Sequence, residues 1–267
     1  MMNTILQDLS TPNLILAIVN NHLSMLDTFR RWPRMEVHDK GTLKWCISDI
    51  PFPFFNSIFY AQLEPSQIDG TIQFLIEEAR SRGVPLMWWT GPSTKPPDLV
   101  SNLERYGFKG DESSLGMAVV LANLEEPPMP PGFTFRQVSD DAAIKLSCQV
   151  FVAGFELPDF VAEACYDLLH YVEVDSVRAY LGYLDGKPVA TSLLILGAGV
   201  AGMYNVTTIP EARRRGIGAV MTALPLLEAK AMGYRAGILS ASEMGAGVYR
   251  SLGFQEYYKV GQYIWSP

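Results

Sequence analysis

Cysteine and histidine are scarce in this chain of 267 residues, with three of each. They are Cys46, Cys148 and Cys165, and His22, His38 and His170. The cysteines are widely spaced and form no Cys-x-x-Cys pair, which excludes a disulfide framework and indicates a reducing compartment. We expect them to be small core residues and not nucleophiles. The histidines are too scattered for a metal-site spacing, so we expect no metal.

A surplus of basic residues and a long apolar run are also missing. The formal net charge is −7, which is unfavourable for general nucleic-acid binding. The longest apolar run, residues 192–204, contains three glycines and suits buried strands better than a membrane span of about 20 residues. Residues 1–8 lack the basic region of a secretory signal. We therefore expect a cytoplasmic protein that binds neither nucleic acid nor membranes.

What is present is the composition of a globular protein, 48% hydrophobic and 18% charged, with a proline-rich break near its middle. Residues 125–132 read Glu-Glu-Pro-Pro-Met-Pro-Pro-Gly, which favours an extended connector because proline disrupts helices and central strands. The break predicts two domains, residues 1–126 and 132–267.

The second domain alternates strand and helix patterns, which predicts a mixed α/β sheet. The expected strands are 133–138, 177–184, 188–196, 199–208, 235–240 and 256–265, and the expected helices are 141–152, 159–170, 217–231 and 245–252. Asp185-Gly186 between two apolar runs predicts a hairpin. Pro225 should weaken or kink the helix 217–231, because proline lacks an N–H.

The first half repeats two short segments of the second half in the same order. Residues 78–83 resemble 228–233, and residues 103–108 resemble 248–254. This pattern predicts a duplicated fold. The first copy has no arginine-glycine loop, since residues 61–69 stand in its place, so it could not bind a phosphate in the same manner.

The most informative segment is residues 213–218, Arg-Arg-Arg-Gly-Ile-Gly, between a predicted strand and a predicted helix. Arginines are unfavourable at a helix N-terminus, where the helix dipole is already positive. A bound anion would remove this conflict, since the first N–H groups of a helix bind phosphate well. The segment thus predicts an anion site, with an exposed basic turn as the alternative.

Residues 208–218, with Pro210 before the arginines, resemble the coenzyme-A motif of GNAT N-acetyltransferases, whose core is Gln/Arg-x-x-Gly-x-Gly/Ala. Residues 246–254 look like the Tyr-x-x-x-Gly-Phe ending of the same family. The resemblance covers residues 133–267 and implies a GNAT-like acetyltransferase fold. The first half would be a degenerate second copy, as in tandem members.

The resemblance implies acetyl-CoA as cosubstrate. Backbone groups of Val206, Thr207 and Thr208 would pair with the pantetheine arm, and amides in the arginine-glycine loop would bind the pyrophosphate. The implied cofactor-binding set is Val206, Thr207, Thr208, Arg213, Arg214, Arg215, Gly216, Ile217, Gly218, Ala219 and Ser242. At Ser242 many members have an asparagine, to which serine is only partly equivalent.

Tyr249 stands where the family has a catalytic tyrosine, which would protonate the leaving thiolate; the alternative is an ordinary buried tyrosine. Some members carry a glutamate base where this chain has Gly237. A water chain, Tyr204, Asn205 or Glu243 could supply the base, and the sequence does not choose among them.

The sequence thus predicts an acetyl-CoA-dependent N-acetyltransferase acting on a primary amine of a small molecule, amino acid or peptide. The alternative is a non-catalytic acyl-CoA-binding regulatory module, while a nucleotide-triphosphate site lacks its motifs. Glu156 and Asp159 occupy the region that often shapes the acceptor pocket in such enzymes; the alternative is that they are ordinary solvated acids of a loop. Trp45, Trp88 and Trp89 are expected to pack in the core or between domains, and the chain to be a monomer or homodimer.

Overall fold

A computed structural model describes residues 4–173 and 175–267. The chain divides into two compact units, each built from separate segments. The C-terminal unit comprises residues 4–21 and 116–257 of the described chain, and the N-terminal unit comprises residues 22–115 and 258–267. These units differ from the predicted consecutive domains, residues 1–126 and 132–267. The assignment of those two segments as copies of one domain stays a prediction.

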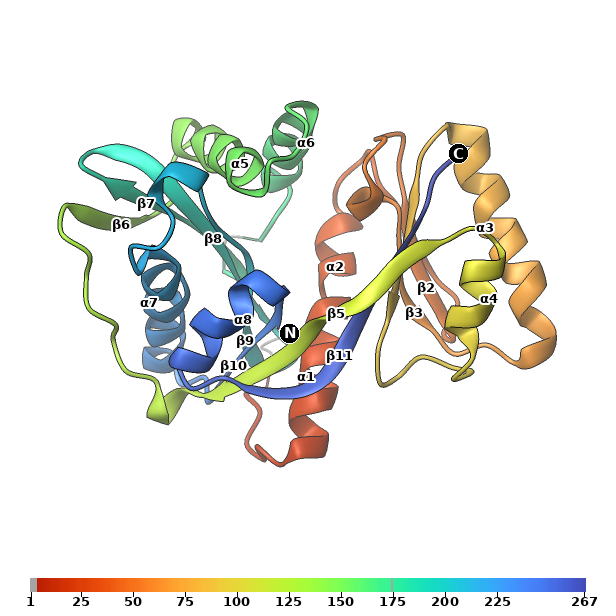
Figure 1. The fold of residues 1–267 in the computed structure, drawn as a ribbon, viewed down its shortest axis with the longest axis horizontal. Coiled ribbons are helices and arrows are strands. Elements are labelled where there is room, and N and C mark those ends of the chain that lie inside the picture. The colour runs from red at the N-terminus through yellow and green to blue at the C-terminus, as the bar shows by residue number, and fades with distance from the viewer. Residues whose placement is uncertain (1–3, 174) are drawn as a thin grey trace. The chain divides into compact units, whose positions relative to one another are not determined.

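Both units contain helices and strands (Figure 1). The α-helices are α1 Thr11–Leu23, α2 Met25–Phe29, α3 Ile68–Arg82, α4 Leu99–Arg105, α5 Asp141–Phe155, α6 Phe160–Leu169, α7 Ile217–Ala231 and α8 Glu243–Ser251. The strands are β1 Glu36–Asp39, β2 Leu43–Ile47, β3 Ser57–Ala61, β4 Leu86–Thr90, β5 Lys109–Val120, β6 Phe133–Gln137, β7 Val177–Leu184, β8 Lys187–Gly197, β9 Val200–Thr208, β10 Ala236–Ala241 and β11 Gln255–Trp265. Short 3₁₀ helices are Pro53–Phe55, Pro65–Gln67, Leu121–Asn123 and Pro210–Ala212. The predicted mixed α/β class is confirmed.

In the C-terminal unit the strand order is β5-β10-β9-β8-β7-β6. Strands β9 and β10 are parallel, whereas β6 to β9 form an antiparallel meander. The predicted hairpin joins β7 to β8, with positive φ angles of 50° at Asp185 and 76° at Gly186. Two consecutive positive φ angles define the turn that fits the twist of a hairpin.

Helices cover both faces of these strands. A Cβ on Gly237 of β10 would lie 2.9 Å from Leu226 of α7, and a Cβ on Gly202 of β9 would lie 2.2 Å from the amide oxygen of Asn21 in α1. Gly202 is in register with Ile238, the neighbour of Gly237, and successive residues in a strand face opposite ways. Helices α1 and α7 therefore lie on opposite faces.

Helix α7 passes through Pro225 without ending, and Pro225 is buried. Packing of this apolar helix on the strands therefore outweighs the local cost of an interior proline, about 3 kcal/mol. Helix α5 begins as predicted, because the Asp140 side chain accepts a hydrogen bond from the Ala143 amide at 2.8 Å. It continues to Phe155, one turn beyond the predicted end, and Glu156 ends it with a positive φ of 56°.

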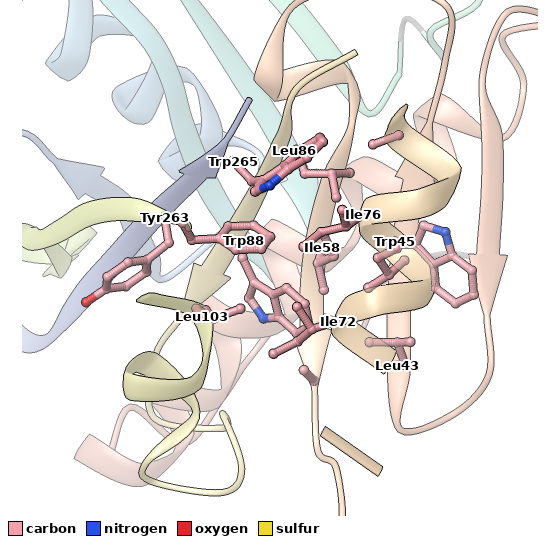
Figure 2. Close-up of a cluster of buried hydrophobic side chains, with 14 of the residues drawn as sticks. Leu43, Trp45, Ile58, Ile72, Ile76, Leu86, Trp88, Leu103, Tyr263 and Trp265 are labelled. Carbon is pink, nitrogen blue, oxygen red and sulfur yellow. The ribbon is translucent and has the colours of Figure 1, made fainter. Parts of the chain in front are cut away.

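The N-terminal unit has the strand order β1-β2-β3-β4-β11-β5, with β3 and β4 parallel. Helices α3 and α4 lie on one side of these strands (Figure 1). Their apolar residues pack with Trp45, Trp88, Tyr263 and Trp265 in one buried cluster (Figure 2). Trp45 and Trp88 are core residues, as expected, with 5% and 0% of their surface exposed. Trp89 contacts His22 and Phe59 instead.

Among the described residues, no helix is both long and apolar enough to cross a membrane. The cysteines are free, and Cys46 and Cys148 are buried. Burial raises the pKa of each of these two thiols to about 12, which leaves them protonated at neutral pH. Their predicted role as small core residues is confirmed.

Candidate active site

The site lies in the C-terminal unit, where the parallel strands β9 and β10 stop pairing. Their register runs from Ala201↔Gly237 to Met203↔Leu239 and ends there. Immediately afterwards β9 forms a bulge, because Tyr204 and Thr207 oppose Leu193 and Thr191 of β8 and leave two residues against one. Asn205 occupies this bulge with a φ of 51°. A bulge turns a strand away from its neighbour, so β9 and β10 diverge at this point.

A cavity of about 320 Å³ opens at this divergence. Of the predicted residues, it is lined by Val206, Thr207, Thr208, Arg213, Arg214, Gly216, Ile217, Gly218, Ala219, Ser242 and Tyr249. Arg215 is exposed and does not line it. The structure thus brings together all but one of the residues that the motif selects, although their contact with a cofactor stays a prediction.

The arginine-glycine loop leads into α7 through two residues in the left-handed region. Arg214 has a φ of 65° and Gly216 a φ of 79°, and Gly216 precedes the first helical residue. No side chain caps α7 and its first turn contains no acidic residue. The Ala219 amide already donates to the Gly216 carbonyl at 3.2 Å, so the amides that the helix start offers to an anion are those of Ile217 and Gly218. A Cβ on Gly218 would meet no described atom within 4 Å, so packing does not require this glycine.

Arg213 differs from its two neighbours, because its side chain is engaged within the protein. Its Nε donates to the Thr208 carbonyl at 3.0 Å, and its guanidinium donates to the Gly154 carbonyl at 2.8 Å. An ion pair of 3.3 Å to Glu156 completes these contacts. Arg213 therefore fixes the loop against β9 and the end of α5, whereas the side chains of Arg214 and Arg215 are exposed.

Tyr249 projects from α8 into the cavity and is buried, with 9% of its surface exposed. Burial raises the pKa of its hydroxyl to about 12, and no charged group contributes to the shift. The phenol therefore keeps its proton at neutral pH and can donate it. Ser242 caps α8 by accepting a hydrogen bond from the Gly245 amide at 3.3 Å, so its side-chain oxygen is partly used within the protein.

The candidate bases lie elsewhere. Tyr204 donates its hydroxyl to the Asn21 amide oxygen at 2.7 Å, and Asn205 and Glu243 are exposed. Tyr204, Asn205 and Glu243 are absent from the described lining of the cavity, as are aspartate, glutamate and histidine side chains in general. Gly237 has no room for a glutamate, because a Cβ there already meets Leu226 at 2.9 Å and Leu121 at 3.1 Å.

Several lining residues were missed by sequence reasoning. Gly154 and Phe155 end α5, and Met244 and Val248 lie on α8. A Cβ on Gly154 would lie 2.5 Å from the Thr207 hydroxyl, so this glycine lets α5 approach β9 closely. No local motif marks these positions, since Gly154 and Phe155 reach the cavity through the packing of α5 on the strands, and Met244 and Val248 reach it through the placement of α8.

A second cavity, of about 660 Å³, lies between α5 and α6. Glu156 and Asp159, the residues expected near an acceptor, line it together with Glu163, Lys145 and Tyr166. The Tyr166 hydroxyl donates to Asp141 at 2.8 Å, and His170 contacts the same carboxylate at 3.0 Å. The pKa of Asp141 is lowered first by the hydrogen bond from Tyr166 and then by that to His170.

Comparison with known proteins agrees with this geometry. Residues 132–247 match the model of an acetyltransferase (GNAT) domain. No curated protein matches the sequence. A GCN5-related N-acetyltransferase from Kribbella flavida is similar in structure, with a TM-score of 0.70 and 19% identity over 92% of this chain and 94% of that chain.

Two further structures resemble the chain over nearly its whole length. A GCN5-related N-acetyltransferase from Sphaerobacter thermophilus has a TM-score of 0.65 and 16% identity, over 98% of this chain and 94% of that chain. A tandem GNAT protein from the clavulanic acid biosynthesis pathway has a TM-score of 0.59 and 14% identity, over 96% and 94%. Residues 132–247 therefore form an acetyltransferase domain of the GNAT family, and the fold of that family extends over most of the chain.

Proposed function

We propose that this chain is an acetyl-CoA-dependent N-acetyltransferase of the cytoplasm, acting on a primary amine of a small molecule, amino acid or peptide. One observation carries the proposal. The divergence of β9 from β10, the uncapped start of α7 and the buried hydroxyl of Tyr249 all border one cavity. An extended thioester cofactor with a pyrophosphate needs these three features together.

The residues fit acetyl-CoA in their donor chemistry. Val206, Thr207 and Thr208 line the cavity where β10 no longer pairs with β9, and of their backbone groups the Thr208 carbonyl already accepts a hydrogen bond from Arg213. In the proposed complex, amides of the loop and of the start of α7 within residues 214–218 bind the pyrophosphate, and exposed Arg214 and Arg215 add positive charge. Arg213 holds this loop in shape through its own hydrogen bonds. When bound, acetyl-CoA supplies a thioester whose carbonyl carbon a neutral amine can attack.

In this proposal Tyr249 is the general acid. Its pKa of about 12 keeps the proton on the phenol at neutral pH, and the phenol donates it to the sulfur as the C–S bond breaks and negative charge develops there. No carboxylate or imidazole from the described residues lines the cavity. The amine must therefore arrive in its neutral form or lose its proton to water.

The cavity between α5 and α6 suits the acceptor side of the reaction. Glu156, Asp159 and Glu163 face a single lysine there, Lys145, so the lining carries excess negative charge. Excess negative charge favours a cationic amine over an anionic or neutral one. A panel of diamines, amino-acid amides and N-acetylated peptides would rank these acceptor classes.

The experiment that tests the function is mass-spectrometric detection of an acetylated amine formed from acetyl-CoA and the panel. We expect product with the wild-type chain and a loss of about 10²-fold in kcat in Tyr249→Phe, within the usual range for a general acid. The same variant should retain the KM for acetyl-CoA. Product formation that is identical in Tyr249→Phe would contradict the assigned role of the hydroxyl.

The alternative is a non-catalytic module that binds acyl-CoA and regulates a partner. The absence of an acidic or imidazole base from the described lining of the cavity favours it. It predicts cofactor binding without turnover of any amine. Acetyl transfer that depends on Tyr249 would exclude this alternative.

A further inference from the structure

The N-terminal unit repeats the framework on which the candidate site is built. In the C-terminal unit this framework is β9-α7-β10-α8, and in the N-terminal unit it is β3-α3-β4-α4. In both, the two strands are parallel and pair over a few residues only. The pairing is Ala201↔Gly237 to Met203↔Leu239 in one unit, and Ser57↔Met87 and Ile58↔Trp88 in the other. Strand β3 therefore also leaves β4 before its end.

In the N-terminal unit the chain itself occupies the place beside β3. After β4 ends at Thr90, residues 91–94 form a turn, closed by a hydrogen bond from the Thr94 amide to the Gly91 carbonyl at 3.0 Å, which brings Lys95 to the end of β3. The Lys95 amide donates to the Ala61 carbonyl at 3.0 Å, and the Leu63 amide donates to the Lys95 carbonyl at 3.1 Å. Gln62 and Lys95 form a parallel β-bridge. The Ala61 carbonyl and the Leu63 amide, which could pair with an extended ligand at the end of β3, are thus already bonded.

Side chains hold this segment in place. The Gln62 side-chain amide donates to the Ser93 carbonyl at 3.1 Å, and the Thr94 hydroxyl accepts from the Gly91 amide at 2.9 Å. These bonds lie within a few residues of the Lys95 contacts. Residues 91–95 therefore form a fixed strap and not a loose connection between β4 and α4.

The start of the following helix is closed to anions as well. The 3₁₀ turn Pro65–Gln67 leads directly into α3, and Glu64 and Gln67 bond each other's backbone amides as a capping box of this turn, whereas α3 itself has no side-chain cap. Asp69 lies in the first turn of α3 and forms an ion pair with Arg105. A phosphate approaching these amides would meet the carboxylates of Glu64 and Asp69. The start of α7 has neither a cap nor an acid.

We infer that the N-terminal unit is a copy of the cofactor-binding framework in which the strap of residues 91–95 occupies the position of the cofactor's arm. The chain therefore binds one acetyl-CoA, in the C-terminal cavity, and its N-terminal unit binds none. The stoichiometry rests on the proposed function. The occupation of the β3 edge by the strap is supported independently, by the hydrogen bonds of residues 61–63 and 91–95.

Isothermal titration of the full chain with acetyl-CoA tests the stoichiometry. We expect one equivalent for the wild type and none for Arg214→Glu with Gly216→Val, which adds charge and bulk to the C-terminal loop. Arg105→Gln, which removes the partner of Asp69, serves as a control and should still bind one. Two equivalents in the wild type, or one that survives the double substitution, would overturn the inference. No binding by a folded wild type would overturn the proposed function instead.

Amide hydrogen exchange tests whether the strap occupies the β3 edge, and it relies on neither acetyl-CoA binding nor turnover. The amides of Leu63 and Lys95 should be protected in the free chain and unchanged by acetyl-CoA, while amides of residues 216–219 gain protection when it binds. Gln62→Ala should increase exchange at Ser93 to Lys95 without altering residues 216–219. Free exchange of the Leu63 and Lys95 amides in the unliganded wild type would show that the strap does not occupy the β3 edge and would refute the inference.

Discussion

Replacing Arg213 separates its structural role from that of the neighbouring arginines. Arg213→Gln removes two hydrogen bonds to the carbonyls of Thr208 and Gly154, and an ion pair to Glu156. A hydrogen bond from a charged donor contributes about 1.5–3 kcal/mol when buried. The Arg213 side chain is 30% exposed, so we use about 1 kcal/mol for each carbonyl.

The ion pair adds little to this sum. Glu156 has 67% of its side chain exposed, and such pairs contribute less than about 0.5 kcal/mol. The free energy of unfolding should therefore fall by about 2 kcal/mol in Arg213→Gln. That change lowers the unfolding midpoint by about 4–8 °C in a chain of this size.

Arg215→Gln is the matched control, because it removes the same charge two positions further along the chain. The Arg215 side chain is exposed and does not line the cavity. We expect the unfolding midpoint of this variant to remain within about 1 °C of the wild type, in keeping with a surface substitution. Both should be measured by calorimetry without ligand, followed by the KM for acetyl-CoA, which we expect to rise more in Arg213→Gln than in Arg215→Gln. Equal midpoints for the two variants would refute the structural role of Arg213.

Other consequences can be tested in the same way. Gly237→Ala should lower the free energy of unfolding by about 1–3 kcal/mol, since its Cβ would lie 2.9 Å from Leu226, and calorimetry of this variant checks that packing. Burial raises the pKa of Tyr249 to about 12, so ionisation of this tyrosine should cause no fall in kcat between pH 8 and about pH 10.5. A decline in kcat near pH 10 that Tyr249→Phe removes would contradict this. Burial lowers the pKa of His22 from 6.5 to about 4, so the unfolded chain binds the proton first as the pH falls. The free energy of unfolding should decrease by about 2–3 kcal/mol from pH 6.5 to pH 4, and urea titrations of His22→Phe should lack that part of the decrease.

Local sequence signals predicted the parts of the site that depend on short segments. The loop at 213–218 and the helix after it need only neighbouring residues, so their pattern is readable. The hairpin at Asp185-Gly186 was found for the same reason, because its two positive φ angles favour those residue types. Tyr249 could be selected as a cavity residue only through the family resemblance, since its spacing alone fits any short helix.

The boundaries of the two units and several long-range contacts depend on non-local packing, so they could not be predicted from the sequence. Strand β5 has residues in both compact units, as does β11, whereas the proline-rich break suggested two consecutive domains. Gly154 reaches the site because α5 crosses β9, and Lys95 reaches β3 across a separation of more than thirty residues. Strand pairing over such separations depends on the whole fold and leaves no mark in a local pattern.

The same limit applies to Arg213. Its place in the motif suggested contact with a phosphate, and only the structure shows its guanidinium turned toward the carbonyls of Thr208 and Gly154. Pro225 lies buried within the continuous helix α7, and the weakening or kink expected from it stays a prediction.

The most direct test of the account is the unfolding midpoint of the wild-type chain with and without acetyl-CoA, with ATP and NAD at equal concentration as controls. A ligand at 100 times its dissociation constant stabilises the folded state by about 2.7 kcal/mol. We predict a rise of about 5–10 °C that is specific to acetyl-CoA and absent in Arg214→Glu with Gly216→Val. No rise with acetyl-CoA, or an equal rise in the double variant, would contradict a cofactor site in the C-terminal cavity.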